Sequence, residues 1–285
     1  MTNSLKLALI AAGQLRRYPV VRLRNLADRL GPVKAQSFRQ ASRFANSLKA
    51  GYPVHKYEDL ADCQTIVVCA THRRLHALLS ELEGTDFDWS RKTILLGCGQ
   101  HDSGNLRGLA AKGASVGALF QFGSLQESRF FVEGDKAAVR AAKLLVEGSG
   151  GQLLEIRMGR SGVCAAGVTL ATTLVISAMH SSVRCFRHAG LSSSDAAAAV
   201  GSLAQMSLRS YLRAGQRAFK LPRSAEERHA FQQRAESLER ADPKLGAFFS
   251  DLGKLVLESE GWDSSWLDDP PLRVFHARAS AEPAA

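Results

Sequence analysis

The sequence has few cysteines and no Cys-x-x-Cys pair, which argues against a disulfide-stabilised protein and against a zinc protein. Its five cysteines are an odd number, and most lie inside apolar runs. We therefore expect buried thiols in a reducing, cytoplasmic compartment, and neither a disulfide framework nor a zinc site. No histidine or carboxylate cluster has metal-ligand spacing, and we expect no serine-centred nucleophile elbow. The sequence predicts no resident metal.

Uninterrupted apolar segments of membrane-spanning length are also lacking. Residues 163–179 are apolar, but glycine, threonine and serine interrupt them and they are too short to span, so a core helix is expected. The apolar letters LALIAA near the start lead at once into a polar, arginine-containing stretch, so export is not expected. We predict no membrane partner.

Dense basic runs are absent although the chain is basic overall. Its 37 lysines and arginines outnumber 27 acidic residues, giving a net charge of +10. These charges are spread along the chain and do not alternate with aromatic residues, so nucleic acid is not an expected partner. We therefore expect a basic soluble surface with a few arginines directed at phosphates. The expected partner is a small-molecule substrate.

The stretch from Leu5 to Arg17 organises the first half of the chain. A short apolar run ending at Ile10 is typical of a strand buried on both faces of a parallel sheet. Small residues follow it, at the place where a Rossmann fold holds a dinucleotide diphosphate against the next helix. Of the three fingerprint glycines only Gly13 is present, because Ala11 and Arg16 occupy the other two positions.

Strands and helices alternate after this first strand and then give way to helices. We expect strands at 33–37, 54–57, 65–70, 93–97, 115–120, 130–134 and 152–156, and helices at 18–30, 40–49, 72–82, 106–112 and 136–148. Further helices are expected at 161–188, 196–215, 225–241 and 244–260, with caps at Ser192 and Ser224. The predicted fold class is α/β, an N-terminal Rossmann-type doubly wound sheet followed by an all-α C-terminal domain. The expected domains are 1–158 and 159–276, with a flexible tail at 277–285.

Candidate cofactor-binding residues lie in three of the predicted loops. They are Ala11, Gly13, Gln14, Leu15 and Arg16 after the first strand, Ser37 and Arg39 after the second, and Thr71 and His72 after the strand at 65–70. The second strand lacks the acid that binds the ribose of NAD, so serine and arginine there favour NADP. The alternatives stay open: the first turn binds nothing, the arginines are solvated, or Arg16 and Arg17 contact phosphates through their side chains.

Candidate catalytic residues are His101, Ser103 and His180. The first two follow the strand at 93–97, at the ligand-binding edge of an open α/β sheet. A histidine there can donate a proton to a carbonyl or imine as hydride arrives. The alternatives are a structural turn at 101–103, with Asp102 as a helix cap, and a structural histidine in the helix that carries His180.

Several short stretches in order along the chain carry a family resemblance. They are residues 101–104 (HDSG), 113–117 (GASVG), 131–135 (FVEGD), 190–191 (GL) and 241–243 (ADP). The chain resembles Rossmann-like proteins of unknown function related to pyrroline-5-carboxylate reductase and 6-phosphogluconate dehydrogenase. The resemblance implies an N-terminal NAD(P)-binding domain, a helical C-terminal domain, a homodimer formed through those helices, and a substrate site in the cleft between the domains.

The chain departs from this family where cofactor and substrate should bind. Thr71-His72 replaces a Val-Pro pair, Phe120-Gln121 replaces a His-Pro pair, and residues 219–222 (FKLP) replace a Thr-Gly-Pro stretch. Two functions therefore stay open. One is an NAD(P)-dependent oxidoreductase acting on C=O or C=N, or in reverse on CH–OH or CH–NH. The other is a non-catalytic scaffold, sensor or partner protein that has kept the fold.

Overall fold

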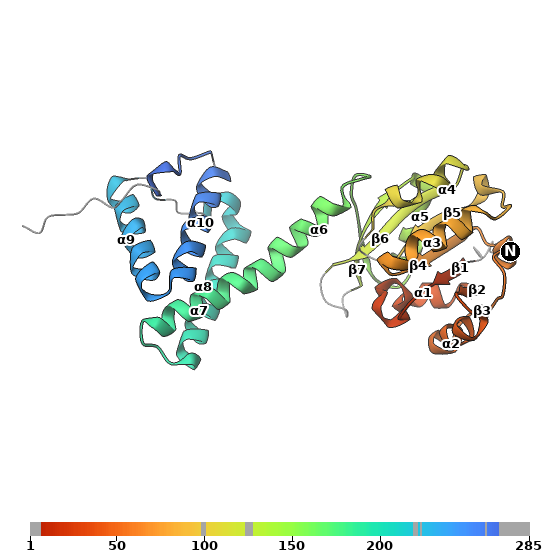
Figure 1. Ribbon diagram of the computed structural model, residues 1–285, viewed down its shortest axis with the longest axis horizontal. Coiled ribbons are helices and arrows are strands. Elements are labelled where there is room, and N and C mark those ends of the chain that lie inside the picture. The colour runs from red at the N-terminus through yellow and green to blue at the C-terminus, as the bar shows by residue number, and fades with distance from the viewer. Residues whose placement is uncertain are drawn as a thin grey trace, which may run out of the picture. The chain divides into compact units, whose positions relative to one another are not determined.

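The computed structural model describes residues 7–97, 101–122, 128–218, 222, 224–259 and 261–267 (Figure 1). Its contacts divide the chain into two units, Met1–Thr169 and Leu170–Ala285, whereas the sequence places the boundary between residues 158 and 159. The predicted tail at 277–285, Leu5, Cys98 and residues 219–221 lie outside the described residues.

The first unit is built on one eight-stranded sheet with the order β3-β2-β1-β4-β5-β6-β7-β8. The strands are β1 Leu7–Ala11, β2 Leu30–Ala35, β3 Tyr52–Pro53, β4 Thr65–Cys69, β5 Thr93–Leu96, β6 Ser115–Gln121, β7 Arg129–Gly134 and β8 Gln152–Glu155. All neighbouring strands are parallel except β6 and β7. The first six strands have the Rossmann order.

Successive side chains of the central strands point to opposite faces of the sheet. Both faces are buried. On β1, Leu9 belongs to one hydrophobic cluster and Ile10 to the other, and both are 0% exposed. On β5, Leu95 and Leu96 divide in the same way. Continuous apolar runs are therefore required in these strands.

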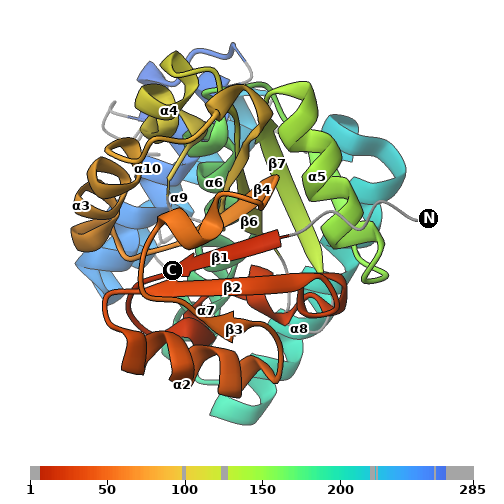
Figure 2. The same cartoon turned by 90° about the vertical axis from the view of Figure 1, so that its right-hand side faces the viewer.

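Helices cover both faces of this sheet. They are α1 Arg24–Ala27, α2 Phe38–Leu48, α3 His72–Glu83, α4 Arg107–Ala111 and α5 Lys136–Glu147. Leucines of α3 and α4 join one core cluster, whereas apolar residues of α2 and α5 join the other. Figure 2 shows α3 and α4 on one side of the sheet and α5 on the other. The predicted fold class is confirmed, with an antiparallel β6–β7 pair in an otherwise parallel sheet.

The expected helix at 18–30 is wrong. The chain there forms two short 3-10 turns, Leu15–Arg17 and Pro19–Arg22, and then the four-residue α1. Leu23 takes an extended conformation and separates the last two, and the Tyr18 hydroxyl donates to the Ala12 carbonyl at 2.8 Å. Strand β2 consequently begins at Leu30, and not at residue 33. The strand expected at 54–57 is also displaced, because β3 spans Tyr52–Pro53.

The second unit contains only helices among its described residues. They are the π-helical segment Leu170–Leu174, α7 Val175–His188, α8 Ser193–Ala214, a 3-10 turn Gly215–Ala218, α9 Ala225–Ala241, α10 Pro243–Ser259 and a 3-10 turn Ser265–Leu267. Both predicted caps are confirmed: Ser192 accepts from the N–H of Asp195, and Ser224 forms a capping box with Glu227.

An apolar helical stretch, Ser161–His188, begins with α6 (Ser161–Thr169) and continues into α7. It has a mean hydropathy of 1.8 in its most apolar window, and none of that window is buried. The expectation that residues 163–179 form a core helix is therefore wrong for the single chain. By length and composition alone this helix could cross a membrane, and it is the one such helix among the described residues.

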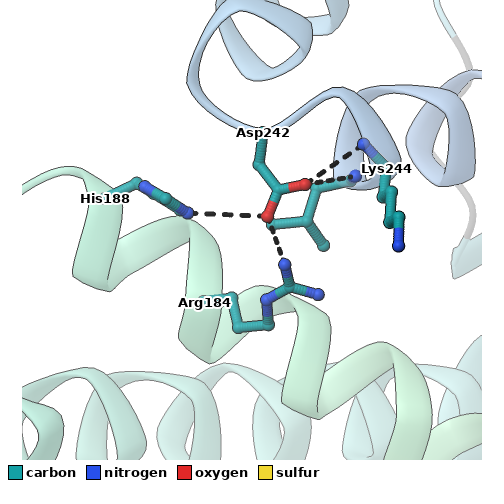
Figure 3. A network of polar contacts seen from close by, with 5 residues as sticks. Arg184, His188, Asp242 and Lys244 are labelled. Carbon is teal, nitrogen blue, oxygen red and sulfur yellow. Dashed lines mark hydrogen bonds and ion pairs between the residues drawn. The ribbon is translucent and has the colours of Figure 1, made fainter.

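A polar network joins α7 to the junction of α9 and α10 (Figure 3). Asp242 accepts from the N–H groups of Lys244 and Leu245 at 3.1 and 3.2 Å, which caps α10. It also pairs with Arg184, and His188 lies 3.7 Å away. Burial would raise the pKa of Asp242, but the Leu245 N–H, the Arg184 guanidinium and then the Lys244 N–H and His188 together hold it below its usual value.

Candidate functional site

The carboxyl ends of β1, β4 and β5 lie side by side and position three of the candidate loops. The N–H of Ala12 donates to the Cys69 carbonyl at 2.8 Å, and the N–H of Gly97 donates to the Val68 carbonyl at 2.9 Å. These bonds continue the parallel ladder past the ends of the strands. The chain leaves the sheet at neighbouring points, at the edge where ligands bind in open α/β sheets.

The turn after β1 has a sharply bent backbone at Gly13, where φ is +99°. An added Cβ there would lie 3.1 Å from Thr71 Cγ2 and 3.4 Å from Tyr18 Oη. Ala11 and Leu15 are buried, whereas Gln14 and Arg16 are exposed. Glycine is therefore required by the backbone conformation and by the approach of the loop after β4.

This turn fits the diphosphate of a dinucleotide in two respects and departs from the usual cradle in one. The glycine lies at the carboxyl end of β1, next to the loop after β4, and Arg16 and Arg17 are exposed beside it. The long helix whose N-terminus normally faces the phosphates is replaced by short turns. The positive charge for a diphosphate must therefore come from the arginine side chains.

The loop after β2 carries the candidates for the adenosine end of a cofactor. Ser37 caps α2, since its Oγ accepts the N–H of Gln40 at 3.2 Å, and Arg39 is exposed on the first turn of that helix. Beside them, Phe38 stacks on His55, with 4.0 Å between ring centroids and 4° between ring planes. Sequence reasoning missed this aromatic pair, because Phe38 begins α2 and His55 follows β3, in separate segments of the chain.

The structure brings together two of the predicted histidines. His72 begins α3 and is exposed, and His101 follows β5 and is half-buried. Their rings are stacked, with centroids 5.1 Å apart and an 11° angle between planes. Thr71, half-buried, precedes α3 and contacts the Gly13 turn. The described parts of the loops after β1, β4 and β5 therefore lie close together.

The surroundings of His101 disfavour its protonated form. Burial lowers its pKa below the ordinary 6.5 and His72 lowers it further, whereas Asp102 acts in the opposite direction. Its Nε2 atom is buried and has no hydrogen-bond partner among the described residues. Buried side-chain nitrogens usually have a partner, so this atom is unusual among the described residues.

The side chain of Ser103 is buried, whereas a residue that contacts substrate is expected to be accessible. Ser103 is 3% exposed, and both its N–H and its Oγ are directed at one oxygen of Glu133, at 2.7 and 3.0 Å. Its direct contact with a substrate stays a prediction. Sequence reasoning missed Glu133 as a site residue, although a glutamate inside an apolar strand was an available indication, because charged residues are rarely buried unless paired.

The third catalytic candidate, His180, lies on α7 in the second unit and is exposed. Its role stays a prediction. Among the described residues, no group of three or more histidine, cysteine or acidic side chains is placed to hold a metal ion.

The strand order and the helices that follow define a class of protein, a Rossmann-type domain followed by a helical domain. Residues 128–254 match the family model of a domain of unknown function, DUF2520. No curated protein matches the sequence. These residues and the fold together support the resemblance inferred from the sequence.

Solved structures of NAD(P)-dependent reductases share this fold. A reductive aminase from Aspergillus terreus in complex with NADPH and ethyl levulinate is 14% identical over 93% of this chain and 98% of that chain, with a TM-score of 0.63. An imine reductase variant from Myxococcus stipitatus in complex with NAD⁺ is 14% identical over 92% and 97%, with a TM-score of 0.63. A pyrroline-5-carboxylate reductase from Coxiella burnetii is 12% identical over 89% and 99%, with a TM-score of 0.53. At these identities the likeness concerns the fold.

Proposed function

We propose that the protein is an NAD(P)-dependent oxidoreductase, with NADP preferred, that acts on a C=O or C=N bond of a small molecule or on the reverse substrate. The observation that carries the proposal is the stacked pair of His72 and His101 at the carboxyl ends of β4 and β5. In this sheet of Rossmann order β4 stands next to β1 and β5 next to β4, at the edge where the nicotinamide end of a dinucleotide is expected.

In this proposal the loops after β1 and β2 hold the cofactor. The backbone at Gly13 and the side chains of Arg16 and Arg17 hold the diphosphate, and Ser37 and Arg39 contact the 2′-phosphate. The bound cofactor supplies or accepts a hydride. Arginine suits both phosphates because its planar guanidinium forms paired, charge-assisted hydrogen bonds.

His101 handles the proton in this proposal. In the reductive direction the substrate oxygen or nitrogen gains a proton, and a protonated imidazole within hydrogen-bond distance supplies it. The stacked ring of His72 limits the orientations open to His101. Because the His101 pKa lies below its ordinary value, the protonated form becomes abundant at a lower pH than for an ordinary histidine.

Titration of the protein with NADPH and with NADH, followed by calorimetry, tests the proposal. We expect NADPH to bind more tightly, and Arg39→Ala to weaken NADPH by roughly tenfold while leaving NADH nearly unchanged, because a charge-assisted contact to phosphate contributes about 1.5–3 kcal/mol. Arg140→Ala on α5, which removes an equal charge from another exposed position, is the matched control. Absence of binding of either dinucleotide at millimolar concentration would refute the proposal.

A second candidate function is a non-catalytic scaffold, sensor or partner protein. The observation that favours it is the replacement of the helix after β1 by short turns, since that helix normally contributes the phosphate-binding N-terminus. Oxidation of NADPH in the presence of an imine or carbonyl substrate would exclude this candidate.

We also propose that the helix Ser161–His188 forms a homodimer interface and contacts neither membrane nor nucleic acid. Its exposed apolar side chains include Leu170, Leu174 and Ile176, the last 65% exposed, and such surfaces mark interaction sites. Light scattering should show a dimer that Ile176→Asp dissociates and Ser177→Asp, on the same helix, does not. Sedimentation of the wild-type protein with lipid vesicles would contradict the dimer proposal.

A further inference from the structure

Glu133 is a fully buried carboxylate on β7, 0% exposed, that joins two separate segments of the first unit. Its Oε1 atom accepts from the N–H and the Oγ of Ser103, at 2.7 and 3.0 Å. Its Oε2 atom accepts from the N–H groups of Arg160 and Ser161, each at 3.2 Å. One side chain thus satisfies four donors from segments about 57 residues apart in the sequence.

A carboxyl group of this length reaches both sets of donors. It accepts hydrogen bonds at both oxygens, whereas glutamine would present an NH₂ group to one pair of donors. Aspartate is one methylene shorter and reaches only one segment. The N–H groups of Arg160 and Ser161 lie at the start of α6, where a negative charge is favourable. The Arg160 N–H is shared between Glu133 and the Arg157 carbonyl, which lies 3.1 Å away.

The segment on the other side of the carboxylate carries the candidate proton donor. Ser103 follows His101 by two positions and begins the 3-10 turn Ser103–Leu106. Two hydrogen bonds to a buried, immobile carboxylate therefore fix the backbone two residues after the imidazole.

We propose that Glu133 is a positioning residue: through Ser103 it holds the loop that carries His101, and through the first turn of α6 it couples that loop to the helix. The importance for reaction rests on the proposed function. The coupling itself is a property of the protein without cofactor or substrate, so it is measured independently of NADPH binding.

Hydrogen exchange of the full-length protein tests the coupling. Glu133→Gln should accelerate amide exchange at both 101–106 and 160–163 by roughly tenfold or more, because the NH₂ group faces one pair of donors and the link between the two segments through one side chain is broken. Ser103→Ala should accelerate exchange in the loop and leave the first turn of α6 as in the wild type. Glu155→Gln, which makes the same chemical change at an exposed position on β8, should alter neither segment.

The titration midpoint of the His101 ring is a second measurement, and a general loss of stability does not change it. In NMR titrations of labelled histidine, Glu133→Gln and Ser103→Ala should raise the His101 midpoint toward its ordinary value and weaken the ring contact with His72, since burial of the ring holds the pKa down. A uniform increase in exchange, or an unchanged His101 midpoint in both variants, overturns the proposal.

Ser103→Ala carries the test alone if Glu133→Gln does not fold, because it keeps the cap of α6 and removes one bond to the loop. In that case an unchanged His101 midpoint and unchanged loop exchange in Ser103→Ala overturn the proposal. Failure of the wild type to bind NADPH would refute the proposed function and leave the exchange result interpretable.

Discussion

Gly13→Ala separates the structural requirement for glycine after β1 from a role in binding. The residue has φ of +99°, a conformation that costs a residue with a Cβ about 1–2 kcal/mol. The new methyl group would also stand 3.1 Å from Thr71 Cγ2, and this crowding adds about 1 kcal/mol because Thr71 is only half-buried and can shift. The expected loss of stability is therefore about 2–3 kcal/mol.

Gly150→Ala is the matched control for this substitution. Gly150 also has a positive φ, +77°, but an added Cβ would have no atom within 4 Å, so only the backbone cost of about 1–2 kcal/mol is expected. Urea denaturation followed by tryptophan fluorescence, to which the buried Trp89 of the first unit contributes, measures both variants. The difference between them reports the contact with Thr71.

NADPH titration of the folded variants then decides whether a ligand uses the Gly13 turn. If the backbone there approaches the diphosphate, a methyl group at Gly13 should weaken NADPH by at least about tenfold, about 1.4 kcal/mol, and Gly150→Ala should have no effect. Equal NADPH affinity in the two variants, together with the larger loss of stability in Gly13→Ala, would show that the glycine serves packing alone and would refute the proposed diphosphate site.

Three further predictions concern the proton donor, the polar network and the core. The rate of reduction should rise as pH falls and level off below pH 6.5, because protonated His101 becomes abundant only below its lowered pKa; His101→Phe should remove this dependence from the pH–rate profile. Asp242→Asn should destabilise the protein at neutral pH, and in denaturation series this difference should disappear in strong acid, since an acid with a lowered pKa stabilises the fold above its unfolded pKa and loses that effect as pH falls. Leu95→Ala, at a position 0% exposed, should cost about 2–5 kcal/mol, and Leu154→Ala, at a position 40% exposed, less than about 1 kcal/mol in the same denaturation assay.

Sequence alone determined two kinds of element: strands buried on both faces, and helix starts that depend on neighbouring residues. The apolar run of β4, Thr65–Cys69, contains five buried residues, and its short length and β-branched residues favour a covered strand. The caps at Ser192 and Ser224 were also predictable, because a cap depends on residues within one turn. The catalytic candidate His101 could be proposed because residues after a parallel strand lie at the ligand-binding edge.

Tertiary structure alone decided the contacts between residues far apart in the chain. The helix expected at 18–30 is interrupted where the extended Leu23 ends the second 3-10 turn, and the sequence spacing of apolar residues cannot distinguish short packed turns from a continuous helix. The stacking of His72 on His101 and the bonds from Ser103 to Glu133 depend on which strands are neighbours. Strand order is set by packing of the whole sheet, so the residues that share a site become known only once the chain is folded.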